Sequence, residues 1–438
     1  MAKSLLDLDD ALKIVDGVQT ARVAGKVTEL TGLVLRATAP GARAGELVII
    51  ERSRGGPLRA EVVGFRGDEV VLLPLGDAAG VGPDSVVRPT GRPFAIRCGP
   101  SLLGRVLDGI GEPIDRLDEP AGLEPWPIER PAPDPLRRRR VTAPLALGVR
   151  ALDGCLTVGE GQRIGLFAGP GLGKSSLLGQ IARHSEAEVN VIALVGERGR
   201  EVRDFIETQL GDEGLRRSVV VAATSDAPPL LRLKSALVAT AIAEHFRERG
   251  KRVLLLLDSL TRVARAQREV GLAAGEPPAR QGFPPSVFAM LPRLLERTGQ
   301  SDRGSITAVY AVLTGTDDGD DPVADEVRAI LDGHIWLSRD LAARNHWPAI
   351  DVVRSLSRVM DEIVDEKHRE AAANLREAIS TYERQRDLIL LGAYRRGSDE
   401  DTDWAIDMID EAYGFLRQAR DERQPFDVTR KQLIALFG

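Results

Sequence analysis

The sequence predicts an α/β protein in three parts: a small N-terminal β-barrel, a central doubly wound parallel sheet, and a C-terminal helical bundle. Short β-rich runs punctuated by glycine fill residues 24–93, the pattern of a small barrel or sandwich. Nearly all-apolar strands alternate with helical segments after Pro144, and charged amphipathic segments without strands follow from about Asp361,. The bounds that we expect are 1–23 for a leader, 24–95 for the barrel, 96–360 for the sheet domain and 361–438 for the helices.

Composition narrows the classes of protein that the chain can represent. Its 438 residues are 43% hydrophobic and 28% charged, the balance of an ordinary globular protein,. The net charge of −6 argues against a dedicated nucleic-acid binder, which concentrates Lys and Arg,. Cys98 and Cys155 lie far apart, so neither a zinc site nor a disulfide framework is predicted,. The N-terminus lacks the basic and apolar regions of a signal peptide, and no apolar run reaches membrane-spanning length,. We therefore expect a cytoplasmic protein whose membrane association, if any, is peripheral.

The elements before the central sheet are predicted from turn and proline signals. Residues 1–23 read as an acidic, partly helical leader. Gly55-Gly56 and Arg66-Gly67-Asp68 are predicted hairpin turns, because glycine accepts the positive φ that such turns require,. The Pro-rich stretch 124–144 is predicted to be an extended connection near the boundary between the two folds,. Its run Arg137–Arg140 is either a site for an anion or partner, or a solvated linker face, and we favour the second,.

A glycine-rich segment after the apolar strand 163–167 is the sharpest functional signal. It reads AGPGLGKS and precedes a helical run. Glycines let consecutive N–H groups point into one concavity, a helix N-terminus adds positive partial charge, Lys174 reaches terminal phosphates and Ser175 ligates Mg²⁺. Ala168 replaces the first glycine of the usual pattern. The segment therefore predicts a P-loop (RecA-like) domain. The alternative is a glycine-rich turn from strand to helix that binds no ligand. The candidate nucleotide-binding residues here are Gly169, Pro170, Gly171, Leu172, Gly173, Lys174, Ser175 and Ser176.

Two acidic residues at strand ends complete the predicted chemistry. Asp258 ends the buried run VLLLLD and is the candidate Mg²⁺-organising carboxylate, although it could instead cap the next helix,. Glu197, in GERGRE, follows the second strand of the domain, where a carboxylate lies beside the phosphates and can position water,. Arg198 beside it is a further catalytic candidate. Taken alone, this segment could be only a solvated loop, but its position at the end of a strand favours the catalytic role.

Long blocks of the chain resemble the type III secretion ATPases, which are related to rotary ATPases and include injectisome and flagellar export enzymes. The resemblance covers about residues 20–420. It rests on GRVLDGIGEPID, PLALGVRALDGCLTVGEGQRIGLFAG, GERGREV, DSLTRVARAQREVGLAAGEPPARQGFPPSVFAMLPRLLERTG, DPVADEVRAILDGHIWLSRDLA and HWPAIDVVRSLSRVM. It implies ATP hydrolysis with Mg²⁺ in a homohexamer that releases secreted proteins from chaperones and promotes their unfolding and export. The implied partners are a central stalk-like protein, a peripheral stator-like regulator and chaperone–cargo complexes, at the inner-membrane periphery and without nucleic acid.

The resemblance also assigns roles to single residues. It matches Lys174 and Ser175 to the P-loop roles, Asp258 to the Mg²⁺-organising carboxylate and Glu197 to the residue that activates water. It matches Arg358, in SLSR, to the arginine given to the neighbouring subunit's site; from the residues alone, a surface salt bridge is the alternative. Trp347 falls where the family has an aromatic ring against adenine. A tryptophan can equally fill a core.

Several features stay open or point to rival functions. Leu272–Pro284 resembles the loop that faces the central pore, and the acidic run 317–321 reads as a solvated loop rather than a calcium site,. The histidines predict no transition metal,. The rivals are a proton-driven rotary synthase subunit and a hexameric nucleic-acid translocase; the single aromatic residue before position 90, Phe65, argues against the latter,. Within the secretion family we favour the injectisome branch.

Overall fold

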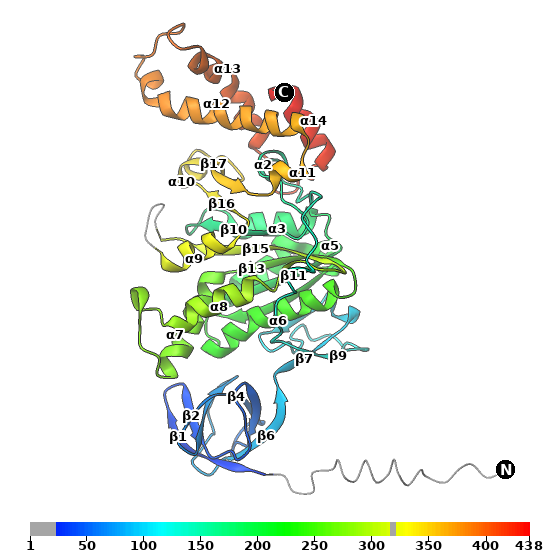
Figure 1. Cartoon of the computed structure of the whole chain (residues 1–438), viewed down its shortest axis with the longest axis vertical. Helices are drawn as coiled ribbons and strands as arrows, with labels where there is room; N and C mark the ends of the chain where they lie inside the picture. Colours follow the sequence, from blue (N-terminus) through cyan, green and yellow to red (C-terminus); the bar gives the residue numbers. More distant parts are fainter. Residues whose placement is uncertain (1–22, 316–320) are drawn as a thin grey trace, which may run out of the picture. The chain divides into compact units, whose positions relative to one another are not determined.

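The computed structural model describes residues 23–315 and 321–438. It divides into two compact units, Met1–Phe94 and Ala95–Gly438 (Figure 1). The leader predicted for residues 1–23 lies outside the described residues, apart from Val23. The same holds for most of the acidic run 317–321; its described member, Asp321, caps the helix that follows by accepting from the amides of Val323 and Ala324.

The first unit is the predicted barrel. Its strands close in the order β1-β2-β5-β4-β3-β6. Alternate residues face the interior, as in β3, where Val48 and Ile50 are fully buried,. Gly55 and Gly67 have positive φ in the turns on either side of β4, as predicted. The strands are β1 Gly25–Thr31, β2 Val34–Ala37, β3 Glu46–Ile50, β4 Leu58–Arg66, β5 Glu69–Pro74 and β6 Val86–Pro93.

The second unit is built on a mostly parallel sheet. The strand order is β17-β16-β10-β15-β13-β11-β12-β8, with β14 paired to β15, and β17 runs antiparallel to β16 at one edge. Every residue of β11 is buried, because helices cover both faces,. The strands are β8 Val106–Asp108, β10 Arg163–Ala168, β11 Val189–Glu197, β12 Ser218–Thr224, β13 Arg252–Asp258, β14 Gly299–Gln300, β15 Ser305–Leu313, β16 Gly333–Leu337 and β17 Ile350–Ser357. A separate pair, β7 Ala95–Cys98 and β9 Glu124–Pro127, begins the unit.

Helices flank this sheet, and the chain after β17 forms helices without further strands in the described residues (Figure 1). The predicted C-terminal helices pack on the short helix α2, where Leu152, Leu375 and Leu433 share one hydrophobic core. Asp365 and Asp399 cap the two longest of them,. The α-helices are α2 Arg150–Cys155, α3 Lys174–His184, α4 Gly199–Asp204, α5 Gly211–Arg216, α6 Pro229–Arg247, α7 Leu260–Ala273, α8 Pro285–Leu295, α9 Pro322–Ile330, α10 Arg339–Ala343, α11 Met360–Ile363, α12 Glu366–Leu390, α13 Glu400–Leu416 and α14 Phe426–Phe437. The 3-10 turns η1 Pro100–Leu102 and η3 Arg280–Gly282 and the π-helix η2 Phe205–Leu210 complete the set.

The arginine run in the Pro-rich connection departs from the prediction. Arg137 is exposed and pairs with Asp302, as a solvated linker would. Arg138 is instead half-buried, and its Nη1 donates to the carbonyl oxygen of Thr298 at 2.8 Å. The solvated-face prediction is therefore wrong for Arg138, because the connection passes beside a bend whose carbonyl oxygens require donors. The whole connection lies within the second unit.

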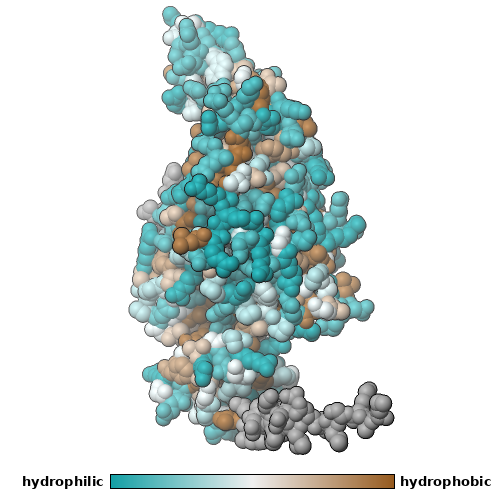
Figure 2. Space-filling model, turned by 45° about the vertical axis from the view of Figure 1, so that its right-hand side comes forward, coloured by the Kyte–Doolittle hydropathy of each residue, from teal (hydrophilic) through white to brown (hydrophobic). Residues whose placement is uncertain are grey.

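The face of the molecule that is turned to the viewer in Figure 2 is largely hydrophilic. Figure 2 shows charged and polar residues over most of the face turned to the viewer, with small scattered hydrophobic patches. In the described parts of the chain, no helix combines the length and the apolar character needed to span a bilayer.

Candidate active site

The glycine-rich segment forms a turn between β10 and α3. Gly171 and Gly173 have φ of 79° and 80°, in the left-handed region that side chains disfavour, and Gly173 is the N-cap of α3,. Lys174 and Ser175 therefore occupy the first turn of an 11-residue helix, where free N–H groups and the helix dipole attract anions,. This is the geometry that the P-loop hypothesis requires.

Ala168 does not disturb this turn. It is the last residue of β10, pairs with Leu313 of β15 and is buried. Its backbone is extended rather than left-handed, so a Cβ is tolerated at this position,. The glycines that the turn requires lie three and five residues later.

Two carboxylates from neighbouring strands meet the P-loop lysine. Glu197 ends β11 and Asp258 ends β13, and parallel strands present their carboxyl ends at one edge of the sheet,. Lys174 Nζ forms an ion pair with Asp258 Oδ1 and lies 3.6 Å from Glu197 Oε1. The three side chains are 12%, 9% and 3% exposed, for Lys174, Glu197 and Asp258 respectively. Asp258 does not cap α7, whose N-cap is Ser259.

The environment of Glu197 changes its acidity. Burial, together with the nearby carboxylate of Asp258, raises the pKa of Glu197 to about 7 against the opposing effect of Lys174,. Glu201 shares a hydrogen bond with Glu197, and this bond lowers the pKa of Glu201. A carboxyl group with a pKa near neutrality can accept a proton from water at physiological pH.

Arg262 is a site residue that the sequence analysis missed. It lies on the first turn of α7, and its guanidinium donates to the carbonyl oxygen of Gly196 and, at 3.1 Å, to Glu197 Oε2. Gly196 has φ of 70°, and a Cβ there would lie 2.9 Å from Arg262 Cδ. The arginine thus holds the end of β11 and the orientation of Glu197. The available signal was its position four residues after Asp258, one helical turn away from the strand end.

Trp347 lies against the P-loop. A cavity of about 380 Å³ is bounded by Gly171, Gly173, Trp347 and the segment 418–420 between α13 and α14. A Cβ on Gly173 would lie 2.9 Å from Cζ3 of the indole, so the ring and the turn are in close contact. The side chain is 38% exposed, which excludes the core-filling alternative and leaves a face available for stacking,.

Two predicted residues lie outside this cluster. Arg198 is 75% exposed and pairs with Glu201 at 3.0 Å. Arg358 follows the edge strand β17 and is exposed. Its backbone amide donates to the carbonyl oxygen of Asp332, whereas its guanidinium forms no hydrogen bond or ion pair within residues 23–315 and 321–438. The surface salt bridge considered for Arg358 is therefore not formed in the described chain.

Family models match all three parts of the chain. Residues 27–91 match the β-barrel domain of the ATP synthase alpha/beta family, and residues 148–357 match the nucleotide-binding domain of the same family. Residues 364–435 match the T3SS EscN ATPase C-terminal domain. The last match distinguishes the secretion branch within this wider family.

Curated relatives extend the match over nearly the whole length. The chain is 54% identical to the type 3 secretion system ATPase of Xanthomonas euvesicatoria, over 94% of this chain and 93% of the relative. The chain belongs to the type 3 secretion ATPase family. It is accordingly an ATP-hydrolysing enzyme of protein secretion, rather than a member of either rival class.

Flagellar members of the family are equally near. The flagellum-specific ATP synthase of Bacillus subtilis is 50% identical, over 94% of this chain and 95% of the relative. These values do not separate the injectisome branch of secretion ATPases from the flagellar branch, so the preference for the injectisome stays a prediction.

A solved structure of a secretion ATPase has the same fold. The assembled ATPase EscN from the type III secretion system of enteropathogenic E. coli is 46% identical, with a TM-score of 0.90. The match covers 94% of this chain and 100% of EscN. EscN in complex with its central stalk EscO matches with a TM-score of 0.88, at 46% identity and the same coverage.

Proposed function

We propose that this secretion ATPase hydrolyses ATP at sites shared between copies of itself in a homohexameric ring. The observation that carries the proposal is the cluster of Lys174, Glu197 and Asp258 beside the N-terminus of α3. The P-loop, residues 169–176, holds the phosphates, and Trp347 stacks on adenine. Arg358 acts on the site of the adjacent copy.

The hydrolytic step uses these groups in separate roles. Glu197 orients a water molecule and accepts its proton as the water oxygen bonds to the γ-phosphorus. The bond from that phosphorus to the β–γ bridging oxygen breaks, which leaves ADP and inorganic phosphate. Lys174 and Arg358 stabilise the negative charge that develops on the phosphoryl oxygens. Arg262 holds Glu197 in place through its bond to Oε2.

The residues at this edge of the sheet also fit Mg²⁺. Ser175 supplies an exposed hydroxyl at the start of α3, and Asp258 supplies a carboxylate at the end of β13. Mg²⁺ prefers such oxygen ligands and usually shares them with substrate phosphates. When bound, it neutralises charge on the β- and γ-phosphates. We propose Ser175 and Asp258 as the residues that hold it.

The coupling to secretion is proposed from the relatives. EscN has been solved assembled and in complex with its central stalk. We propose that this chain likewise forms a ring around a stalk-like protein, and that Leu272–Pro284, which includes the end of α7 and the connection to α8, faces it. We further propose that it works in the cytoplasm at the periphery of the inner membrane. There it would meet a stator-like regulator and chaperone–cargo complexes.

The decisive experiment is ATP turnover per chain, with Mg²⁺, across a wide range of protein concentration. A site completed by a second copy predicts specific activity that rises with concentration. Doping with Arg358→Ala should then lower the activity of the wild-type chain, because mixed rings contain interfaces without the arginine. Arg354→Ala, which changes an exposed arginine on β17 four residues before Arg358, is the matched control and should not lower the activity of mixed rings. The shared site would be overturned by a specific activity that does not change with protein concentration and that Arg358→Ala does not lower.

A further inference from the structure

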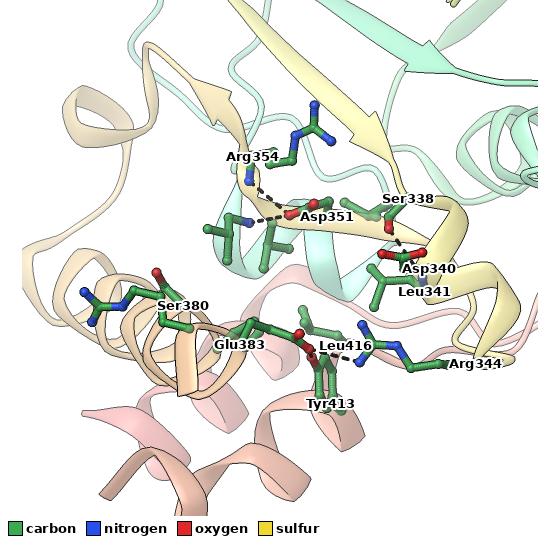
Figure 3. Close-up of a pocket in the computed structure, with 15 residues that line it drawn as sticks. Ser338, Asp340, Leu341, Arg344, Asp351, Arg354, Ser380, Glu383, Tyr413 and Leu416 are labelled. Carbon is green, nitrogen blue, oxygen red and sulfur yellow. Dashed lines mark hydrogen bonds and ion pairs between the residues drawn. The ribbon is translucent and has the colours of Figure 1, made fainter. Parts of the chain in front are cut away.

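A second cavity lies between the sheet and the C-terminal helices, outside the proposed ATP site. It has a volume of about 420 Å³ and is lined by residues of α10, β17, α12 and α13 (Figure 3). This volume is within the range of sites that hold small organic ligands. Its apolar lining consists of Leu341, Ile350, Val352, Val353, Ile379 and Leu416. The apolar walls predict a ligand with a hydrophobic body.

Two of the three carboxylates that line the cavity already have donors, and the third, Asp340, is exposed. Figure 3 shows Arg344 and Tyr413 pointing toward Glu383, and both donate to its Oε1, at 2.9 and 2.6 Å. Asp351 Oδ1 accepts from the amides of Val353 and Arg354. Glu383 and Asp351 therefore offer little to a cationic ligand.

One lining cation has no carboxylate partner. Within the described chain, the guanidinium of Arg384 donates to the neutral hydroxyl of Thr381, at 3.0 Å, and forms no ion pair. The side chain of Arg384 is exposed, so its guanidinium is accessible and can bind a carboxylate of a ligand through charge-assisted hydrogen bonds. The combination of this arginine with apolar walls selects an amphipathic molecule with an anionic head.

A short loop connects this cavity to the nucleotide site. The loop begins at Arg344, which lines the cavity, and reaches Trp347 at the P-loop. Trp347 Nε1 donates to Asn345 Oδ1 at 2.9 Å, and the Trp347 carbonyl accepts from the amide of Gln418. Chain continuity and the bond between Trp347 and Asn345 thus connect Arg344 to the indole.

His346 provides a second connection. It is buried, neither ring nitrogen has a hydrogen-bond partner, and its ring packs edge-on against Tyr413 with centroids 5.4 Å apart. Tyr413 itself lines the cavity and bonds Glu383. Within the described chain the imidazole has only packing contacts, so the ring of Tyr413 is in direct contact with the residue next to Trp347.

We propose that this cavity is a regulatory site for an amphipathic carboxylate, whose occupancy changes the affinity for ATP through the loop from Arg344 to Trp347. The head of the ligand pairs with Arg384, and its body lies against Leu341, Ile379 and Leu416. The coupling, but not the binding, rests on the proposed stacking of Trp347 on adenine. Coupling of this kind is reciprocal, so ATP changes the affinity for the carboxylate by the same factor.

Calorimetry of the full chain with decanoate, below its micellar concentration, tests the site without any turnover. We expect saturable binding of one decanoate per chain, weakened about tenfold by Arg384→Gln through loss of the charge-assisted bonds. Arg369→Gln, an exposed arginine on the same helix and outside the cavity, should leave binding unchanged. Ser380→Trp, which fills the cavity, should abolish it, whereas Ala373→Trp on the exposed face of α12 should not.

The outcomes that contradict the proposal are distinct. Equal affinity for decanol and decanoate would overturn the carboxylate head, and binding that survives Ser380→Trp would overturn the site. For the coupling, decanoate should change the KM for ATP about fivefold in the wild-type chain and not in Ser380→Trp. Binding with an unchanged KM overturns the regulation, whereas failure of the proposed catalytic roles would leave the calorimetry intact.

Discussion

Two regions of the sheet place their charged residues in opposite environments. The P-loop edge is formed by the carboxyl ends of the central strands beside the P-loop, and the β17 edge is the end of the edge strand β17. Lys174, Glu197 and Asp258 are buried and paired with one another at the ends of strands β11 and β13 and the start of α3. Arg358 is exposed after an edge strand, and its guanidinium has no partner in the described chain. At the P-loop edge the charged side chains compensate one another within a single chain, whereas at the β17 edge the charge of Arg358 is not compensated in the described chain.

This difference bears on how a catalytic site can be divided. Buried charges must be compensated inside the fold, because desolvating an unpaired ion costs several kcal/mol. An exposed arginine meets no such requirement and can complete a site on another molecule. The contrast between the edges is what a site shared between copies requires, and the predictions below test it.

The strongest test combines two inactive variants. Lys174→Ala removes the cation that binds the phosphates, and Arg358→Ala removes the arginine proposed to act in trans, which is worth roughly a thousandfold or more in related phosphoryl-transfer enzymes. Each variant alone should have turnover near background. In an equal mixture, about a quarter of the interfaces join two intact halves, so turnover should reappear. ATP turnover of the mixture against each variant alone is the measurement.

A control separates complementation from refolding. Mixing Lys174→Ala with the double variant Lys174→Ala/Arg358→Ala supplies no intact P-loop and should stay inactive. Activity in that mixture, or none in the first one despite normal assembly, would contradict the division of the site between the two edges.

Glu197→Gln probes the P-loop edge alone and is the next largest effect. The amide keeps the size of the side chain but cannot accept a proton from water, so turnover should fall about a hundredfold to ten-thousandfold. Affinity for ATP should be retained, because the phosphate-binding groups remain. Equilibrium binding of a fluorescent ATP analogue, measured beside kcat, distinguishes the two effects. Undiminished kcat would remove Glu197 from its proposed role.

The same contrast explains what could be predicted from the sequence. The proximity of Lys174, Glu197 and Asp258 can be predicted because their positions follow from local order along the chain, at the start of a helix and at the ends of apolar strands. The barrel, the parallel sheet and the helical C-terminal part followed from hydrophobic periodicity for the same reason.

Features that depend on long-range packing were not predictable. Arg262 contacts Glu197 across 65 residues, and the burial of Arg138 depends on a carbonyl 160 residues away. The cavity beside Arg384 joins α10 and β17 to helices α12 and α13, and no local pattern specifies that contact. Arg198, chosen for its neighbourhood in the sequence, points to solvent because its strand ends one residue earlier.

Trp347 tests whether the nucleotide pocket extends beyond the phosphates. Removing a stacked ring typically costs about 1–3 kcal/mol per base, so Trp347→Ala should raise the KM for ATP about tenfold. The kcat should change little, because the indole does not touch the reacting atoms. Trp347→Phe keeps a stacking face and should recover most of the affinity. Equal KM values for wild type and Trp347→Ala would show that the exposed ring plays no part in ATP binding.

We expect the smallest and most specific effect from Arg262→Gln, because this substitution alters the pKa of one buried carboxyl group, that of Glu197. The pKa of Glu197 is raised by burial to about 7, and Glu197 must be ionised to accept a proton, so kcat/KM should rise with pH up to about 7 and then level,. The Arg262 guanidinium lowers this pKa, and its removal should therefore move the rising limb to higher pH,. The pH profile of kcat/KM is the measurement.

Arg265→Gln, at an exposed neighbour on α7, is the control and should not change the pH at which kcat/KM rises. This control separates the titration of Glu197 from that of ATP itself. If the rising limb of the kcat/KM profile lies at the same pH in Arg262→Gln as in the wild type, Glu197 does not set the pH dependence. The charge cluster at the P-loop edge would then be structural.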